Sequence, residues 1–210
     1  MVDYGVGNLY SVARALEHCG ASARFVDSAE GIDASDALVL PGVGAFGAGM
    51  RCLHERGLVE PLRRHARSGR PLLGICLGMQ MLFETSTEFG RHEGLGLLPG
   101  EVVPLPDRSP DGGRIKVPRV GWNELLRPEG RADWSGTTLA GVAQGAAVYF
   151  VHSFQAVPTR PVHRIAECEV GGHRVAAVVG EGAVTGCQFH PEKSGAVGLA
   201  VLAGFVQSAG

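Results

Sequence analysis

The stretch that decides the fold is PLLGICLGMQMLFE, residues 71–84. It begins with the short apolar run Leu72–Ile75, which is typical of a buried strand. It ends with Met79–Phe83, where apolar residues recur at a spacing of three to four and predict a helix. Cys76 stands at the change from one period to the other. We therefore expect its sulfur to lie at a sharp turn between a strand and a helix.

Cys76 is flanked by Gly74 and Gly78, and this pattern predicts a nucleophile elbow. Such a turn strains the backbone, and a glycine on each side removes the clashes that a Cβ would make. The following helix N-terminus favours a thiolate, and the amide of Leu77 is available to bind an oxyanion. The alternative is that Cys76 is a buried structural thiol, the common fate of a free cysteine. A cysteine nucleophile also requires a base, so a histidine must lie elsewhere in the chain.

Length and composition exclude several classes of protein. The 210 residues suffice for one domain with a full core, so we expect a single domain over residues 1–210. Charged residues make up 19% and the formal net charge is -2, which predicts no general attraction to nucleic acid or membranes. The five cysteines form no Cys-x-x-Cys pair, so we expect reduced thiols in the cytoplasm and no metal site. No signal sequence, membrane-spanning run or cofactor is expected.

The first part of the chain alternates between strand and helix patterns. Strand patterns at Met1–Asp3, Ala37–Leu40 and Leu72–Ile75 are each followed by a helix pattern. This order predicts an α/β fold with an open, mostly parallel sheet flanked by helices. The first strand is short, and we expect a few residues to precede it. The glycines at residues 5–7 form either a tight turn or a phosphate cradle, although a third glycine is missing.

The last third of the chain reads as an antiparallel extension of that sheet. Segments 163–169, 173–179 and 184–189 are apolar or alternating runs separated by glycines. A closing helix is expected around residues 199–206, where leucine, phenylalanine and valine recur at helical spacing.

Loops are expected at residues 106–114 and 127–141, which are rich in glycine, proline and charge. Trp122 lies between these loops, and its indole either packs in the core or contacts a partner. The glycine-rich run Pro41–Gly47 directly follows a strand pattern. Such loops at the carboxyl ends of strands bind ligands in open α/β sheets, but they also serve as permissive turns.

His190 and Glu192 are the best candidates for the remaining catalytic groups. Pro191 between them favours extended backbone, in which alternate side chains share one side. An imidazole with its own carboxylate would complete a Cys-His-Glu triad with Cys76. His152 is the rival base, but no carboxylate lies near it in sequence.

The elbow, the loop Pro41–Gly47 and the segment Gln188–Ser194 together resemble the class I glutamine amidotransferases. Within that family, the chain is similar to the glutaminase subunits of imidazole glycerol phosphate synthase, from histidine biosynthesis. The segments that carry this closer resemblance cover nearly the whole chain, at residues 3–9, 40–47, 94–97, 121–123, 149–153 and 190–194.

The resemblance implies the class I glutamine amidotransferase fold and a thioester mechanism. Cys76 would attack the carboxamide of L-glutamine, His190 would transfer protons and Glu192 would hold the imidazole. Ammonia would leave, and water would hydrolyse the thioester to glutamate. The residues implied to form the oxyanion hole or to bind glutamine are Gly42, Val43, Gly44, Leu77, Gln80, Ser153 and Phe154.

The resemblance also implies a heterodimer with a (β/α)8-barrel synthase (cyclase) subunit. Ammonia would pass to that subunit, which makes imidazole glycerol phosphate and aminoimidazole carboxamide ribotide. The residues implied to lie near the partner are Asn8, Trp122, Tyr149 and Lys193. Arg119 departs from the family, which usually has histidine before Gly-Trp-Asn, and this departure could alter the partner face.

Three other functions are compatible with parts of the pattern. The chain could serve anthranilate or guanylate synthesis, although the segments at residues 4–8 and 121–123 argue against that. It could be a free-standing cysteine hydrolase, which would be fully active alone. It could also be a non-catalytic interaction subunit, but intact Cys76, His190 and Glu192 argue against that reading.

Overall fold

The two apolar runs before the candidate loop and the elbow are neighbouring parallel strands. In the computed structural model, which describes residues 1–209, these runs form β1 (Leu38–Gly42) and β2 (Leu72–Cys76), and every residue of both is buried. Their register pairs Leu38 with Leu72 and Gly42 with Cys76. The loop after β1 and the elbow after β2 therefore lie at the same edge of the sheet.

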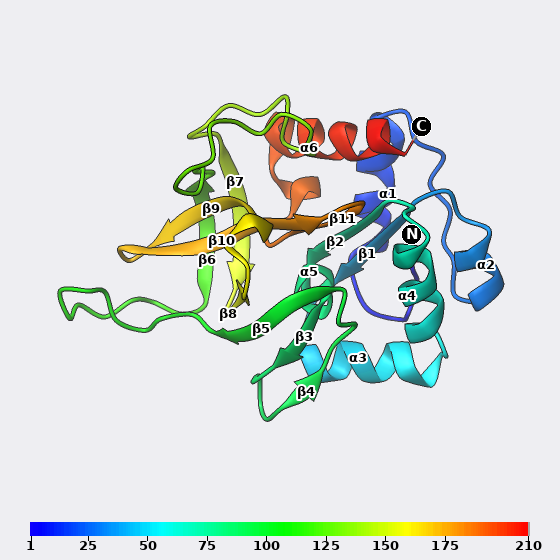
Figure 1. Cartoon of the computed structure of the whole chain (residues 1–210), viewed down its shortest axis with the longest axis horizontal. Coiled ribbons are helices and arrows are strands. Elements are labelled where there is room, and N and C mark those ends of the chain that lie inside the picture. Colours follow the sequence, from blue (N-terminus) through cyan, green and yellow to red (C-terminus); the bar gives the residue numbers. More distant parts are fainter. Residues whose placement is uncertain (210) are drawn as a thin grey trace.

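The central sheet has the order β1-β2-β11-β10-β9. β11 (Val184–Cys187) is parallel to β2, whereas β10 (His173–Glu181) and β9 (Arg164–Val170) continue the sheet in antiparallel fashion. Figure 1 shows this sheet between two groups of helices. The α/β class and the antiparallel extension near the C-terminus are thus confirmed, and the sheet as a whole is mixed.

Smaller sheets lie beside the central one. A four-stranded sheet has the order β4-β3-β5-β8, and a two-stranded ribbon joins β6 and β7. The bounds of these strands are β3 (Phe83–Ser86), β4 (His92–Glu93), β5 (Leu98–Pro104), β6 (Arg119–Glu124), β7 (Ala147–His152) and β8 (Phe154–Pro158).

The helices pack on both faces of the central sheet. They are α1 (Leu9–His18), α2 (Ala29–Asp33), α3 (Phe46–Glu55), α4 (Val59–Arg67), α5 (Leu77–Met81) and α6 (Gly195–Ser208), with 3-10 turns η1 (Pro161–His163) and η2 (Pro191–Lys193). Val39 of β1 belongs to the apolar cluster with α1 and α6, whereas Leu38 and Leu40 belong to the cluster with α3 and α4. This alternation places one helical layer on each face, as Figure 1 shows.

The helix expected to run to Phe83 is shorter than predicted. It ends at Met81, and Phe83 begins β3. The carbonyls of Met81 and Leu82 accept hydrogen bonds from Leu95 and Leu97 instead of continuing the helix. Because the residues here are buried on every side, their apolar pattern could not distinguish a helix from a strand.

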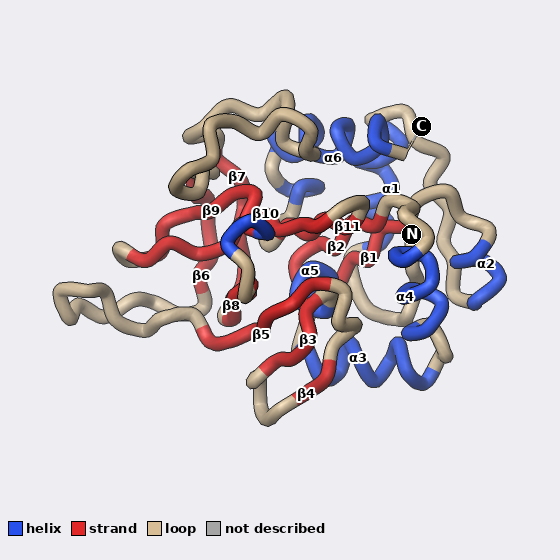
Figure 2. Tube along the Cα trace, viewed as in Figure 1, coloured by secondary structure: helices blue, strands red, loops and turns tan. Residues whose placement is uncertain are grey.

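The loops are irregular as predicted, but one of them is not wholly exposed. Residues 106–114 contain no helix or strand, and Figure 2 shows the connection between β5 and β6 extending away from the sheets. Residues 127–141 likewise lack helix and strand, yet Trp134 and Leu139 are buried. The indole of Trp134 donates a hydrogen bond to the carbonyl of Ile165 at 2.7 Å, which anchors this loop.

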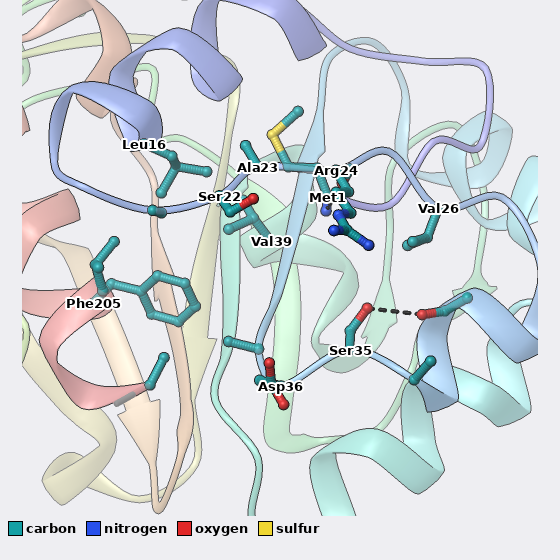
Figure 3. Close-up of a pocket in the computed structure, with 16 residues that line it drawn as sticks. Met1, Leu16, Ser22, Ala23, Arg24, Val26, Ser35, Asp36, Val39 and Phe205 are labelled. Atoms are coloured by element: carbon teal, nitrogen blue, oxygen red, sulfur yellow. Dashed lines mark hydrogen bonds between the residues drawn. The ribbon is translucent and has the colours of Figure 1, made fainter.

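One cavity is lined by residues of the first forty positions and of the last helix. Its volume is about 640 Å³, and Figure 3 shows Met1, Arg24, Val39 and Phe205 around it. The hydroxyl of Ser35 donates to Gly31 at its rim. None of the predicted catalytic side chains lines this cavity.

Within residues 1–209, no helix combines the length and the apolarity needed to cross a bilayer. The same residues hold no group of three or more histidine, cysteine, aspartate or glutamate side chains suited to a metal ion.

Candidate active site

A second cavity, of about 240 Å³, brings together residues from distant parts of the chain. It holds two of the three predicted triad residues, Cys76 and His190, and the rival base His152. The remaining residues that line it are Val43, Gly44, Leu77, Gln80, Glu88, Pro118, Val151, Ser153 and Phe154. Eight of the predicted site residues thus meet in one cavity, because Val43, Gly44, Leu77, Gln80, Ser153 and Phe154 accompany Cys76 and His190.

Cys76 occupies a strained backbone conformation between β2 and α5. Its φ of 54° lies in the left-handed region that residues with a Cβ rarely adopt. A Cβ on Gly74 would lie 2.7 Å from backbone atoms of Gly78, and a Cβ on Gly78 would lie 1.7 Å from the carbonyl oxygen of Leu40. Both glycines are therefore required by close approach of the backbone, as the elbow prediction assumed. Such strain is typical of functional sites.

The sulfur of Cys76 lies at the edge of the cavity with 8% of the residue exposed. The carbonyl of Val151 is 3.9 Å from the sulfur, and the side-chain amide of Gln188 donates to it at 3.8 Å. Gln188 is fully buried and also accepts a hydrogen bond from Gln80. Sequence reasoning assigned no role to Gln188, because it lies within an apolar strand pattern.

His190 and Glu192 form the pair that the sequence predicts, by a different backbone geometry. Nδ1 of His190 is 2.9 Å from Oε1 of Glu192, and both side chains are almost wholly buried. His190 itself is extended, but Pro191–Lys193 forms a 3-10 turn rather than a strand. The turn still brings the two side chains together, so the predicted proximity is confirmed although the extended backbone is wrong.

The surroundings of His190 favour its protonated form. Burial alone lowers the pKa of an imidazole, but the Cys76 sulfur and the Glu192 carboxylate outweigh it and raise the pKa of His190 to about 9. Nε2 of His190 is buried and has no hydrogen-bond partner of good geometry among the described residues.

The rival base His152 has the opposite character. Burial, together with the positive charges of Arg119 and His190, lowers the pKa of His152 to about 4, although its hydrogen bond to the carbonyl of Phe154 acts against that shift. An imidazole with this pKa is neutral at pH 7. Among the described residues, no carboxylate pairs with it, which agrees with the choice of His190 as the base.

The glycine-rich loop after β1 lies beside the elbow. The hydroxyl of Tyr4 donates to the carbonyl of Pro41 at 2.8 Å and fixes the start of the loop. Gly42 does not line the cavity, and a Cβ there would lie 2.3 Å from the Tyr4 hydroxyl. Val43 and Gly44 do line it, and Gly44 has a φ of +95°. The two residues that follow β1 therefore border the cavity, while Gly42 allows the end of the strand to pack closely against Tyr4.

Glu88 is a cavity residue that sequence reasoning missed. Its Oε2 accepts a hydrogen bond from the backbone amide of Phe46 at 2.6 Å, and the residue is largely buried. It places a carboxylate in the cavity that holds Cys76. Its position could not be inferred from the sequence, because residues 85–118 show no periodicity.

The residues expected near a partner lie outside the cavity. Trp122 is 54% exposed and packs edge-to-face on Tyr149, its register partner across the β6–β7 ribbon. Val120 and Val151, on the same ribbon, are also exposed. The indole of Trp122 is therefore not a core residue. Arg119 donates to the carbonyl of Trp122 at 3.0 Å.

The other two expected contacts are Asn8 and Lys193, and both are exposed. Asn8 precedes α1 and accepts a hydrogen bond from the Ser11 hydroxyl rather than capping the helix. Lys193 belongs to η2, one residue beyond Glu192.

Comparison with known proteins identifies the family. Residues 1–207 match the family described as "Glutamine amidotransferase class-I", and the chain belongs to this family. Two solved structures share the fold at low identity: "Crystal structure of glutamine amidotransferase" (TM-score 0.72, 20% identity, covering 99% of this chain and 97% of that one) and "Structure of PurLQS from Thermotoga maritima" (TM-score 0.71, 21% identity, covering 98% and 95%).

Curated relatives point to one particular kind of subunit within this family. "Imidazole glycerol phosphate synthase subunit HisH 1" of Legionella pneumophila (strain Lens) is 51% identical over 207 residues, covering 99% of this chain and 97% of the relative. The HisH subunits of Geobacillus thermodenitrificans and Syntrophotalea carbinolica are 48% and 45% identical, each covering 98% of this chain and 93% and 97% of their own lengths. These relatives confirm the resemblance drawn from the sequence motifs.

The elbow generates a prediction about stability. Gly78→Ala should lower the free energy of unfolding by about 3 kcal/mol or more, because its Cβ would overlap the Leu40 carbonyl, which is rigid backbone. Gly141→Ala is the matched control, since nothing lies within 4 Å of its Cβ, and it should change stability by less than about 0.5 kcal/mol. Urea unfolding of both variants measures the difference, and equal midpoints would contradict the steric argument.

The two histidines generate a prediction about titration. In NMR spectra of histidine-labelled protein, His190 should lose its proton near pH 9, while His152 should stay neutral at every pH above about 5. Because folding raises the pKa of His190 above 6.5, its contribution to stability is complete below pH 6.5 and is lost as the pH rises through about 9. Cys76→Ala and Glu192→Gln should each lower the pKa of His190. Titration of His190 near pH 6.5 in the unaltered protein would refute the assignment.

Proposed function

We propose that this chain is the glutaminase subunit of an imidazole glycerol phosphate synthase. It hydrolyses L-glutamine to glutamate and ammonia at Cys76 and supplies the ammonia to a synthase (cyclase) subunit in histidine biosynthesis. The observation that carries the proposal is the placement of a strained elbow cysteine and a His190–Glu192 pair at one cavity. Full-length identities near 50% to HisH subunits support the choice of pathway.

The chemistry follows from the charge on His190. Its raised pKa favours an imidazolium beside the Cys76 sulfur, so the sulfur is available to attack the carboxamide carbon. Glu192 accepts from Nδ1, which directs Nε2 toward the reacting atoms and stabilises the positive ring. The proton on Nε2 then passes to the departing nitrogen, and the C–N bond breaks to give ammonia and a thioester. Water hydrolyses the thioester, with His190 as base.

The oxyanion that forms during attack needs hydrogen-bond donors at the elbow. We assign this role to the amide of Leu77 and to amides of the Val43–Gly44 segment, because both border the cavity beside Cys76. A single donor of this kind is worth about two to three orders of magnitude in turnover. Binding of the partner is proposed to turn the Val43–Gly44 peptide into the orientation that completes the hole.

The amino-acid end of glutamine requires groups of complementary charge. Gln80 uses its amide nitrogen on Phe154 and on Gln188, so its carbonyl oxygen remains to accept from the substrate ammonium. The carboxylate of Glu88 borders the same cavity and suits the same ammonium group. Ser153 and Phe154 also line the cavity and complete the glutamine pocket in this proposal.

The outer face of the β6–β7 ribbon is proposed as the contact with a (β/α)8-barrel synthase subunit. Four apolar side chains gather there, namely Val120, Trp122, Tyr149 and Val151, of which Trp122 is the largest. Exposed patches of this type mark sites of protein association. Asn8 and Lys193 are assigned to the same interface on the basis of the family resemblance.

Backbone hydrogen bonds support a route from this interface to the reacting groups. The amide of His190 donates to the carbonyl of Tyr149 at 3.0 Å, and the amide of Tyr149 donates to the Ser194 hydroxyl at 3.0 Å. A displacement of Tyr149 by the partner would thus move the backbone on both sides of Glu192. The cytoplasm is the proposed location, in keeping with five free cysteines.

Replacing the nucleophile tests the proposed division of labour. Cys76→Ala should abolish glutamine-dependent synthesis in the complex while leaving ammonium-dependent synthesis intact, because the sulfur takes part only in the hydrolysis of glutamine. Cys52→Ala is the matched control, since this free thiol does not line the cavity, and it should preserve both activities. Both are measured as product formation with either nitrogen source. Loss of ammonium-dependent synthesis in folded Cys76→Ala would overturn the proposal.

The interface is tested by identical changes at two exposed valines. Val120→Ala should weaken the affinity for the synthase subunit, and Trp122→Ala should weaken it more strongly, by about tenfold or more. Tryptophans that are exposed in the free chain and become buried in an interface are frequent hot spots of binding. Val162→Ala should not, since Val162 is 62% exposed in η1, outside the ribbon. Isothermal titration calorimetry compares the three. An equal effect of both valine changes would argue against this face.

A further inference from the structure

His152 occupies a place in the cavity that the proposed mechanism does not use. It is the last residue of β7, and it lies on the inward face of that strand with Val148 and Phe150. It lines the cavity together with Cys76 and His190. The residue is 6% exposed, so its ring is held inside the protein rather than in solvent.

The hydrogen bond made by Nδ1 of His152 determines whether its Nε2 can donate or accept a hydrogen bond. Nδ1 of His152 is 2.9 Å from the carbonyl oxygen of Phe154, which can only accept. Nδ1 must therefore carry the proton, and in the neutral ring Nε2 has a lone pair and no hydrogen. Nε2 is buried and has no partner among the described residues. An unpaired buried acceptor is costly, and such groups are uncommon without a functional reason.

Glutamine brings two kinds of N–H donor into this cavity. Its ammonium group suits Glu88, whose carboxylate is held by the amide of Phe46. Its carboxamide NH₂ is the second donor and must lie at the cysteine end. His152 is near that end, because the carbonyl of its neighbour Val151 is 3.9 Å from the sulfur and His152 lines the same cavity as Cys76 and His190. The substrate carbonyl and carboxylate oxygens are acceptors and do not suit a lone pair.

We propose that Nε2 of His152 accepts a hydrogen bond from the carboxamide N–H of glutamine and then holds the ammonia that leaves. This inference rests on the proposed glutaminase function. As the thiolate of Cys76 forms the S–C bond, the electron pair of the C–N bond moves to nitrogen, and the proton comes from His190. His152 neither gives nor takes a proton, so it binds the leaving group as neutral ammonia.

The charges around His152 agree with this role. The groups that act on its ring are the cationic Arg119 and His190, and both oppose a second positive charge. Arg119 is the register partner of His152 across the ribbon. Burial, the largest cause of the lowered pKa of His152, persists when His190 gives up its proton, so the ring retains its lone pair throughout turnover.

The test compares two substrates that differ in the leaving atom. In the complex with the synthase subunit, His152→Phe should lower kcat/KM for glutamine by about ten- to hundredfold, the effect of one unmade hydrogen bond. It should change kcat/KM for glutamate γ-methyl ester less than about threefold, because that leaving oxygen has no N–H. His152→Gln, which places an amide oxygen near the position of Nε2, should restore most of the glutamine activity. Equal losses on both substrates, or no loss on glutamine, would overturn the proposal.

A second measurement does not depend on changing His152. In ¹⁵N-histidine-labelled Cys76→Ala complex, glutamine should move the Nε2 resonance of His152 upfield, whereas glutamate, which lacks the carboxamide N–H, should not. An unchanged resonance on saturation with glutamine would overturn the proposal. Failure of the glutaminase function itself would look different, because the unaltered complex would then release no glutamate from either substrate.

Discussion

The active site depends on a backbone contact between α5 and β1. At Gly78 the helix approaches the carbonyl of Leu40 so closely that a Cβ would lie 1.7 Å from the oxygen. The contact leaves little freedom in the position of the helix, which begins directly after Cys76, and Cys76 itself lies in the left-handed region. Packing of the interior thus supports the strain at Cys76, in agreement with the rule that strained residues persist where their surroundings over-determine them.

Parallel pairing then brings the other groups to the same edge. β1 ends beside β2, so the loop with Val43 and Gly44 meets the elbow, and β11 runs parallel to β2 on its other side and leads to His190. The carboxyl ends of three neighbouring strands therefore supply the residues proposed as the oxyanion segment, the nucleophile and the base. This is the edge at which open α/β sheets place their ligands.

The sequence predicted the groups whose signals are local and missed those that depend on tertiary contacts. The elbow and the His190–Glu192 pair are short motifs in which spacing alone restricts geometry, and both appear in the structure. Glu88 lies where no periodicity exists, and the polar Gln188 lies within an apolar strand pattern. Trp122 remained ambiguous because only the alternation of exposed residues along β6 shows which way its indole points.

Two histidines in one small cavity are held in opposite charge states by the groups that surround them. Nδ1 of His190 faces a carboxylate, whereas Nδ1 of His152 faces a backbone carbonyl, and both rings are buried. A carboxylate stabilises the imidazolium strongly, whereas the carbonyl raises the pKa of His152 by less than burial lowers it. Pairs of groups whose surroundings separate their pKa values divide the acid–base work between them. Here the separation leaves one ring to move the proton and the other to bind the nitrogen that receives it. Burial and the positive charge of Arg119 keep the pKa of His152 low even after His190 has given up its proton, so the lone pair proposed to hold the ammonia persists.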